Sequence, residues 1–105
     1  MKRKTSLTRG EKRWVGEQAD GYVSSFKVVL DSETAQKLQL PEKTRWDFSK
    51  DETSGTHNLY QAVYRVGQVY ICFWITADPR RSFDSHSHGF RIEWNHQVLY
   101  ECVVG

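Results

Sequence analysis

The residues best suited to chemistry lie in the polar stretch 77–89, which we predict to be a long loop. Within it, His86 and His88 are two positions apart, and in an extended segment side chains at that spacing point to the same side. Two imidazoles placed in this way can chelate Zn, Ni or Fe, with His57 or His96 as a third ligand. A metal site using His86 and His88 is therefore one hypothesis for this stretch.

The same stretch permits a second hypothesis, in which the protein is a metal-independent endoribonuclease of the toxin type. A histidine with a pKa near ~6.5 can exchange protons at neutral pH, and arginine can stabilise the transition state at a phosphate. The residues for this role are Arg80, Arg81, His86 and His88, with Tyr64 or His57 as a further member. However, no lysine follows Lys50, and an RNA-binding face is usually basic. We therefore favour no catalytic residue, no metal ligand and no cofactor.

The charge of the chain is concentrated at its N-terminus. Residues 1–13 contain six basic side chains and one acidic side chain, whereas the remaining 92 residues contain nine basic and twelve acidic ones. A basic segment on a mildly acidic body is suited to a polyanionic or acidic partner. We predict that residues 1–13 form a flexible binding arm and that residues 14–105 form one domain. The binding residues of the arm are Lys2, Arg3, Lys4, Arg9, Lys12 and Arg13.

The most apolar run, Leu59–Thr76, is interrupted by a glycine at the place where a turn is expected. Its alternating β-branched and aromatic residues predict a β-hairpin with a two-residue loop at Val66-Gly67 or Gly67-Gln68. Both loops give the same core face, with Tyr60, Ala62, Tyr64, Val69, Ile71 and Phe73. The opposite face contains Val63 and Cys72 and the candidate binding residues Arg65, Tyr70 and Trp74. We see no evident cover for this second face within the chain.

Other segments complete an α+β fold. We predict a strand over 22–30, a short helix over 31–40 that ends before Pro41, a strand over 44–48 and a second hairpin over 90–104. For the second hairpin, a three-residue loop is favoured because it pairs Ile92 with Tyr100 and Phe90 with Cys102. The predicted fold is a five- to six-stranded, mostly antiparallel sheet in the order β-α-β-β-β-β-β, with the short helix on one face.

The apolar runs of the chain argue against a membrane-spanning or secreted protein. No apolar run reaches the ~18 residues that a membrane span needs, and no hydrophobic signal segment opens the chain. We expect a cytoplasmic protein in which the two cysteines, Cys72 and Cys102, are buried thiols.

The function that we favour is that of a small non-enzymatic binding or inhibitor protein, such as those encoded by phages and other mobile elements. It would engage a protein or nucleic-acid partner through its basic arm and the aromatic second face of its sheet. The simplest alternative is a homodimer, in which a second copy of the chain covers that face.

Overall fold

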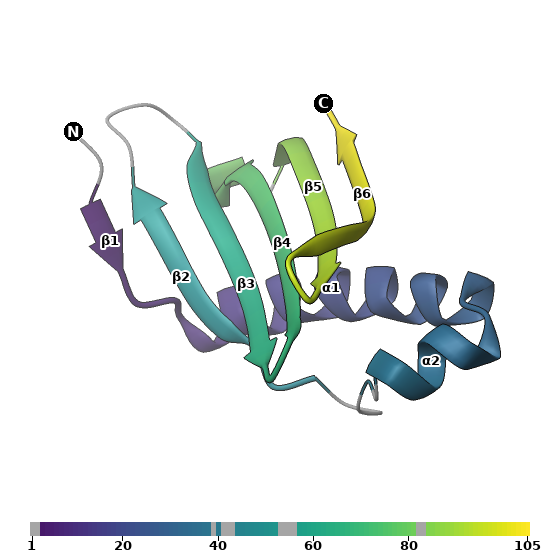
Figure 1. Cartoon of the computed structure of the whole chain (residues 1–105). Coiled ribbons are helices and arrows are strands. Elements are labelled where there is room, and N and C mark those ends of the chain that lie inside the picture. The colour runs from purple at the N-terminus through teal and green to yellow at the C-terminus, as the bar shows by residue number, and fades with distance from the viewer. Residues whose placement is uncertain (1–2, 39, 41–43, 53–56, 82–83) are drawn as a thin grey trace.

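The computed structural model describes residues 3–38, 40, 44–52, 57–81 and 84–105 (Figure 1). The chain forms one antiparallel sheet of six strands whose order in space follows their order in the sequence. The edge strand β1 (Arg3–Thr5) has three residues, and the other five strands are longer. These are β2 (Asp47–Glu52), β3 (Asn58–Val66), β4 (Val69–Asp78), β5 (Asp84–Trp94) and β6 (Gln97–Val104). The α+β class and the antiparallel sheet are thus as predicted.

A long helix, α1 (Arg9–Val29), crosses one face of the sheet. Its buried residues Val15, Ala19, Val23 and Phe26 recur at the three- and four-residue spacing of a helical stripe. The predicted strand over 22–30 is therefore wrong. Within that short window Tyr22, Phe26 and Val28 have the even spacing of a strand, and the helical period emerges only when the stripe is followed back to Val15.

Residues 3–13, which we expected to be a flexible arm, contain secondary structure. Arg3–Thr5 pairs with β2, and α1 begins at Arg9 after the N-cap Thr8. Thr8 and Glu11 form a capping box, in which each side chain accepts a hydrogen bond from the backbone N–H of the other. The cap satisfies backbone donors at the start of the helix, which is why the helix begins inside the basic segment.

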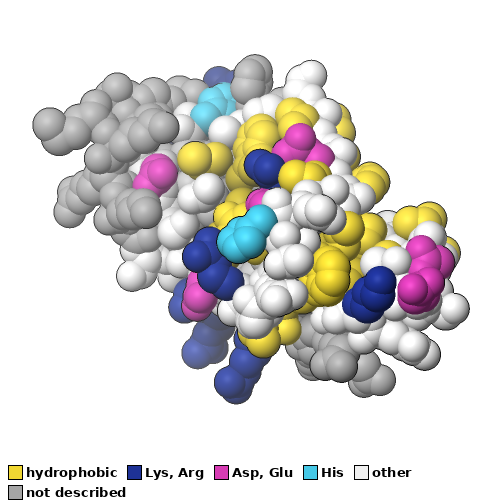
Figure 2. Space-filling view, in the orientation of Figure 1, with side chains coloured by type: hydrophobic (Ala, Val, Ile, Leu, Met, Phe, Trp, Pro, Cys, Tyr) yellow, Lys and Arg dark blue, Asp and Glu magenta, His cyan; other side chains and the backbone are white. Residues whose placement is uncertain are grey.

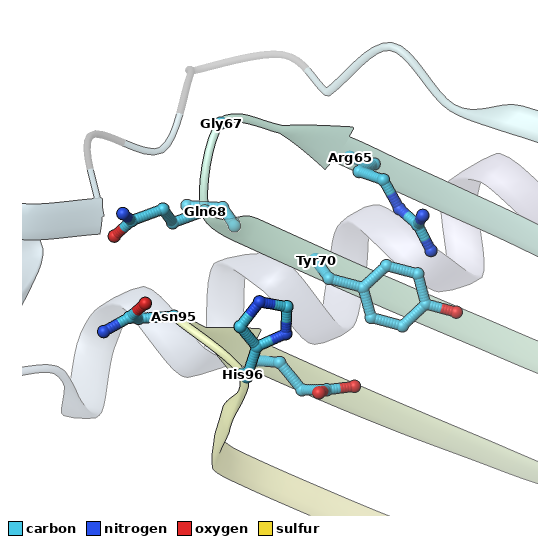
Figure 3. A pocket seen from close by; sticks show the side chains of 8 residues that line it. Arg65, Gly67, Gln68, Tyr70, Asn95 and His96 are labelled. Atoms are coloured by element: carbon cyan, nitrogen blue, oxygen red, sulfur yellow. The ribbon is translucent and has the colours of Figure 1, made fainter.

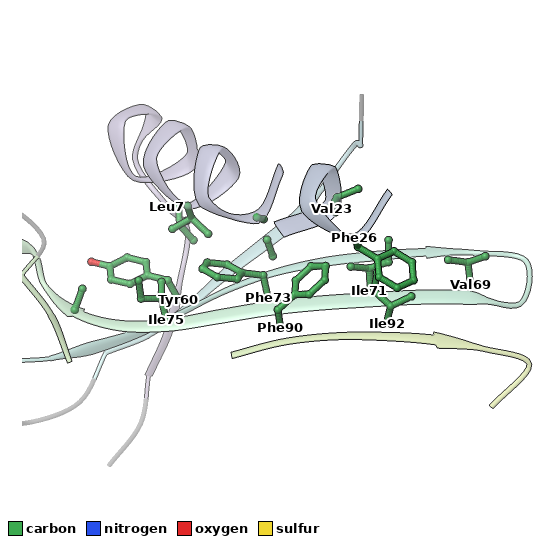
Figure 4. Packing of buried hydrophobic residues seen from close by; sticks show 14 of the residues in the cluster. Leu7, Val23, Phe26, Tyr60, Val69, Ile71, Phe73, Ile75, Phe90 and Ile92 are labelled. Carbon is green, nitrogen blue, oxygen red and sulfur yellow. The ribbon is translucent and has the colours of Figure 1, made fainter. Parts of the chain in front are cut away.

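The hydrophobic core lies between α1 and the sheet (Figure 4). The sheet contributes Tyr60, Ala62, Ile71 and Phe73, each with no exposed surface. These residues belong to the predicted core face of the central hairpin, so that assignment is confirmed. Val15 and Ala19 of α1 are equally buried. α1 is therefore the helix that covers the core face.

The predicted short helix exists as α2 (Ser32–Leu38), but it does not cover the sheet alone as expected. Only Leu38 of α2 is buried. The Lys37 ammonium lies 5.9 Å from the centre of the Trp94 ring, near the turn between β5 and β6. α2 therefore closes one end of the core, and the broad cover comes from α1.

Both predicted hairpins are present, and the length of each turn sets which residues pair. The first has the Gly67-Gln68 loop, since Val66 pairs with Val69, and Gly67 adopts a φ of 59°. The second has the two-residue loop Asn95-His96, with both residues at positive φ, rather than the favoured three-residue loop. A register shift after Ile92 then restores the predicted pairs Ile92–Tyr100 and Phe90–Cys102.

The stretch 77–89 is mostly strand instead of the long loop that its polarity suggested. β4 continues to Asp78, a single 3-10 turn covers Pro79–Arg81, and β5 begins at Asp84. Ser87 pairs with Thr76, and Ser85 pairs with Ala77. His86 therefore falls at a β-bulge, and its side chain lies outside the part of the structure that is described. Residues 82–83 lie outside the described residues.

Candidate binding face of the sheet

The side of the sheet opposite α1, here called the outer face, is the candidate functional site. Along β4 the residues alternate between buried and half-buried from Val69 to Thr76. The half-buried set includes Tyr70, Cys72 and Trp74, whose side chains face away from α1. Among the described residues, no helix packs over them. In the view of Figure 2, which has α1 behind the sheet, hydrophobic side chains gather on this face beside basic and acidic ones.

A hollow of about 440 Å³ lies at the hairpin end of the outer face (Figure 3). The Arg65 guanidinium carbon lies 4.8 Å from the centre of the Tyr70 ring, which is a cation–π arrangement. Glu93 and His96 line the hollow from the second hairpin. Burial is the main cause that raises the pKa of the Tyr70 phenol, with a smaller opposing effect from Arg65. Tyr70 is therefore a neutral hydrogen-bonding group beside a fixed positive charge.

A second hollow of about 270 Å³ adjoins the first along the same face. Tyr70 and Glu93 line both hollows, and Trp74 and Val103 line only the second. Burial raises the pKa of the Cys72 thiol, which also lines it. The two hollows together form a continuous shallow surface with an aromatic centre.

On this surface, one arginine forms ion pairs with two carboxylates. The Arg91 Nε lies 3.3 Å from Glu93 and 3.5 Å from Glu101. These three side chains come from β5 and β6. Counted with Arg65, the outer face has a near balance of charge around its aromatic residues. Such a mixture is typical of protein interfaces, whereas nucleic-acid surfaces are strongly basic.

Trp74 is held in place by a glycine on the neighbouring strand. Gly89 pairs with Trp74, and a Cβ atom built on Gly89 would lie 2.3 Å from the indole Nε1. The ring therefore lies directly over Gly89, at a position where only glycine leaves space for it. This contact fixes one aromatic side chain of the outer face in a single place.

The predicted basic residues lie elsewhere. Arg3 and Lys4 belong to β1, at the opposite edge of the sheet from β6. Arg9 and Lys12 are exposed on the first turns of α1, and Arg13 pairs with Glu17 on the same helix at 3.3 Å. Lys2 lies outside the described residues. Within the described part of the chain, the basic residues and the outer face do not form one site.

The residues proposed for catalysis, as far as they are described, have separate contacts with other parts of the fold. The His88 Nε2 lies 2.5 Å from the Tyr22 hydroxyl of α1, on the core side of the sheet. Arg80 donates from its backbone N–H and its Nε to the Asp78 carboxylate, at 2.9 and 3.4 Å. Burial opposes ionisation of Asp78, but these bonds and the nearby His57 lower its pKa. Arg81 is exposed, and Tyr64 is half-buried. These contacts tie His88 and Arg80 to structural partners.

The described residues also provide no cluster of ligands for the metal hypothesis. Within the part of the chain that the structure describes, no group of three His, Cys, Asp or Glu residues is placed to hold an ion. His57 lies just before β3, near Asp78, whereas His96 lies at the hairpin turn of the first hollow. The two candidate third ligands therefore belong to different regions.

A buried polar cluster was missed by the sequence analysis. Glu11 is 5% exposed and accepts hydrogen bonds from Lys50 Nζ at 3.1 and 3.2 Å and from the Tyr60 hydroxyl at 2.8 Å. Burial would raise the pKa of Glu11, but the bonds from Thr8, Tyr60 and Lys50 together lower it. The spacing of Thr8 and Glu11 could have indicated the helix start. The cluster joins α1 to β2 and β3, and we assign it a structural role.

Comparisons with known proteins found no counterpart for this fold and face. No family model matches the chain, and searches of curated proteins and of solved structures returned no match. None of the described helices is long and apolar enough to cross a membrane. What the fold and the face define is a class, an α+β domain with one face of its antiparallel sheet covered by a helix and the other face left uncovered by the described residues.

Proposed function

We propose that this protein is a non-enzymatic binding protein that holds a protein partner on the outer face of its sheet. The observation that carries the proposal is the half-buried aromatic row Tyr70 and Trp74, which no described element of the chain covers. Apolar surface exposed in a continuous patch is costly in water and is typical of an interaction site. The adjoining hollows give such a partner two depressions to fill.

The charges of the outer face favour a protein over a nucleic acid as the partner. Arg65 and Arg91 are accompanied there by Glu93 and Glu101. A phosphate backbone would be attracted by the two arginines and repelled by the two carboxylates. Tyrosine, tryptophan and arginine are the residues that contribute most to binding at protein interfaces.

The basic residues of the N-terminal segment keep a secondary role in this proposal. Arg9 and Lys12 are exposed and lie away from the outer face, so they are suited to long-range attraction and not to direct contact. Neutralising both with glutamine is expected to slow association and to weaken its dependence on salt. Deleting residues 2–13 would be a poor test, because it would also remove Glu11 and its bonds to the sheet.

Site-specific photo-cross-linking tests the proposed function. A photoreactive phenylalanine analogue placed at Tyr70 is expected to form a covalent adduct with one defined protein in the native cell. The matched position is Gln18, which is exposed on α1. The same adduct from both positions, or adducts with many proteins from Tyr70, would contradict the proposal.

A further inference from the structure

The two edges of the sheet differ in how well they are protected. β1 has three residues, of which Arg3 and Lys4 are basic. Short and charged edge strands discourage pairing with another chain. The other edge, β6, has eight residues, no proline and a single charged side chain, Glu101. β6 is therefore the edge at which an added strand could form backbone hydrogen bonds.

The side chains of β6 are unusually exposed for apolar residues. The exposed fractions are 47% for Val98, 40% for Tyr100, 66% for Val103 and 52% for Val104. A hydrophobic edge strand of this kind is a binding element or an aggregation site. Val103 also lines the second hollow of the outer face, so a segment added to β6 would be continuous with the proposed binding face.

From these observations we propose that β6 binds an extended segment of the partner protein by strand addition. The inference rests on the proposed function, since it states how the same partner is held. The added segment would continue the antiparallel sheet as a seventh strand, with its side chains alternating between the two faces.

A second copy of this chain fits the edge less well. If two copies paired through β6 to form one continuous sheet, the two-fold axis that relates them would be normal to the sheet. Both α1 helices would then lie on the same side of that sheet. Phe26 of α1 contacts Tyr100 of β6, with ring centres 5.8 Å apart, and α1 continues past that contact to Val29. Figure 1 shows this end of α1 extending beyond β6. A pair centred on Tyr100 would thus drive two helix ends into the same space.

Other two-fold registers also have costs. A pair centred on Glu101 would place its carboxylate opposite that of the second copy, which is unfavourable. A pair centred on Cys102 would use only residues 100–104 on each side. A single extended segment has no helix of its own and can pair along the whole of β6, so it is the occupant that the geometry favours.

The chemistry of the added segment follows from its neighbours. On the side of α1 it would lie beside Tyr100 and Val104, which calls for apolar residues at alternate positions. On the outer face it would lie beside Glu101, which shares Arg91 with Glu93. Two carboxylates with one guanidinium leave an excess of negative charge there. The favoured segment therefore alternates apolar residues with lysine or arginine.

Peptide titration tests the inference. The probe is the synthetic octapeptide Thr-Val-Lys-Val-Lys-Val-Thr-Val, and its control has glutamate in place of both lysines. Amide chemical shifts are followed by NMR in the full chain. We expect the lysine peptide to shift the amides of residues 97–104 and to bind about tenfold more tightly than the glutamate peptide, a difference of ~1.4 kcal/mol. Equal affinity, or shifts confined to α1, would overturn the inference.

Two variants with the same substitution sharpen the test. Val103→Lys adds a positive charge at β6, whereas Val28→Lys adds it at an α1 residue that is 84% exposed. The lysine peptide is expected to lose about tenfold in affinity to the first variant and less than about twofold to the second. A similar loss in both would contradict strand addition.

The oligomeric state and the partner separate the remaining alternatives. Sedimentation of the chain alone is expected to give a monomer, and a dimer abolished by Val103→Lys would overturn the inference in favour of a second copy. If the cross-linked partner binds Val103→Lys normally but loses affinity for a Tyr70→Ala variant, strand addition fails and the proposed function stands. If neither substitution changes partner binding, both fail.

Discussion

At the scale of single residues, a buried ion pair between Glu11 and Lys50 joins α1 to the sheet. Both residues are less than a tenth exposed. Breaking a buried pair by removing one partner typically costs ~3–5 kcal/mol, because a charge is left uncompensated. We expect Lys50→Met to lower the free energy of unfolding by about 3 kcal/mol, as measured by urea denaturation. The double variant Glu11→Gln, Lys50→Met should lose less than the sum of the single losses, and strict additivity would contradict the coupling.

The same carboxylate makes stability depend on pH. Since the pKa of Glu11 is lowered in the folded state, the unfolded chain binds the proton more readily. The stabilisation is therefore complete above the ordinary glutamate pKa of about 4.3 and is lost as the pH falls through the folded pKa. Between about pH 5 and pH 3, the wild-type protein should lose more stability than Glu11→Gln. Parallel losses in the two proteins would show that Glu11 is not responsible.

The contact between Gly89 and Trp74 gives a prediction for the outer face. Gly89→Ala forces the indole ring away from its position, since the new Cβ would overlap it. We expect a loss of ~1–3 kcal/mol in stability, typical of overpacking, and a shift in tryptophan fluorescence. In a Trp74→Phe background the fluorescence shift should disappear. A Gly89→Ala protein with unchanged stability and unchanged fluorescence would contradict the close packing.

At the scale of secondary-structure elements, the hairpins were predictable and α1 was not. Strand alternation in Leu59–Thr76 identified the core face correctly, because a shift of one residue in the loop leaves the faces unchanged. α1 was missed because Gly16 and Gly21 interrupt the sequence of the helix and resemble loop residues. Gly16 is tolerated at a close contact, with its missing Cβ position 3.4 Å from the Phe48 ring. Such a helix–sheet contact has no local signature in the sequence.

Gly21 provides a test of this explanation. A Cβ built there has no neighbour within 4 Å, and the residue lies on the exposed side of α1. Alanine in a helix interior is more favourable than glycine by ~0.5–1 kcal/mol. Gly21→Ala should therefore raise the free energy of unfolding by about that amount in thermal or urea denaturation. A destabilised Gly21→Ala protein would argue against a helix at this position.

The candidate site was also predictable in part. Arg65, Tyr70 and Trp74 were placed together on one face by strand alternation alone, and the structure has them on the outer face. Their neighbours Arg91 and Glu93 come from the other hairpin. Their position beside β4 depends on the strand order, which the sequence pattern leaves open. The polar stretch 77–89 was misread as a loop because its Ser and His residues resemble loop composition, although they lie in paired strands.

At the scale of the whole molecule, the fold separates a covered face from an open one. α1 covers the core side of the sheet and α2 closes one end of the core, whereas no described helix packs over the outer face. The basic residues lie at the opposite edge and on α1. In the proposed function the outer face holds the partner, and these charges lie at a distance from it at which they would guide its approach.

The most direct test of this account is the affinity of the cross-linked partner for two purified variants, measured by titration calorimetry. Tyr70→Ala removes an aromatic group from the centre of the outer face, and Lys12→Ala removes an exposed charge from α1. We predict that Tyr70→Ala weakens binding at least about tenfold, equivalent to ~1.4 kcal/mol, as expected for an aromatic hot spot. Lys12→Ala should change the affinity by less than about threefold at physiological salt. Equal affinities for Tyr70→Ala and the wild-type protein would contradict the outer face as the binding site.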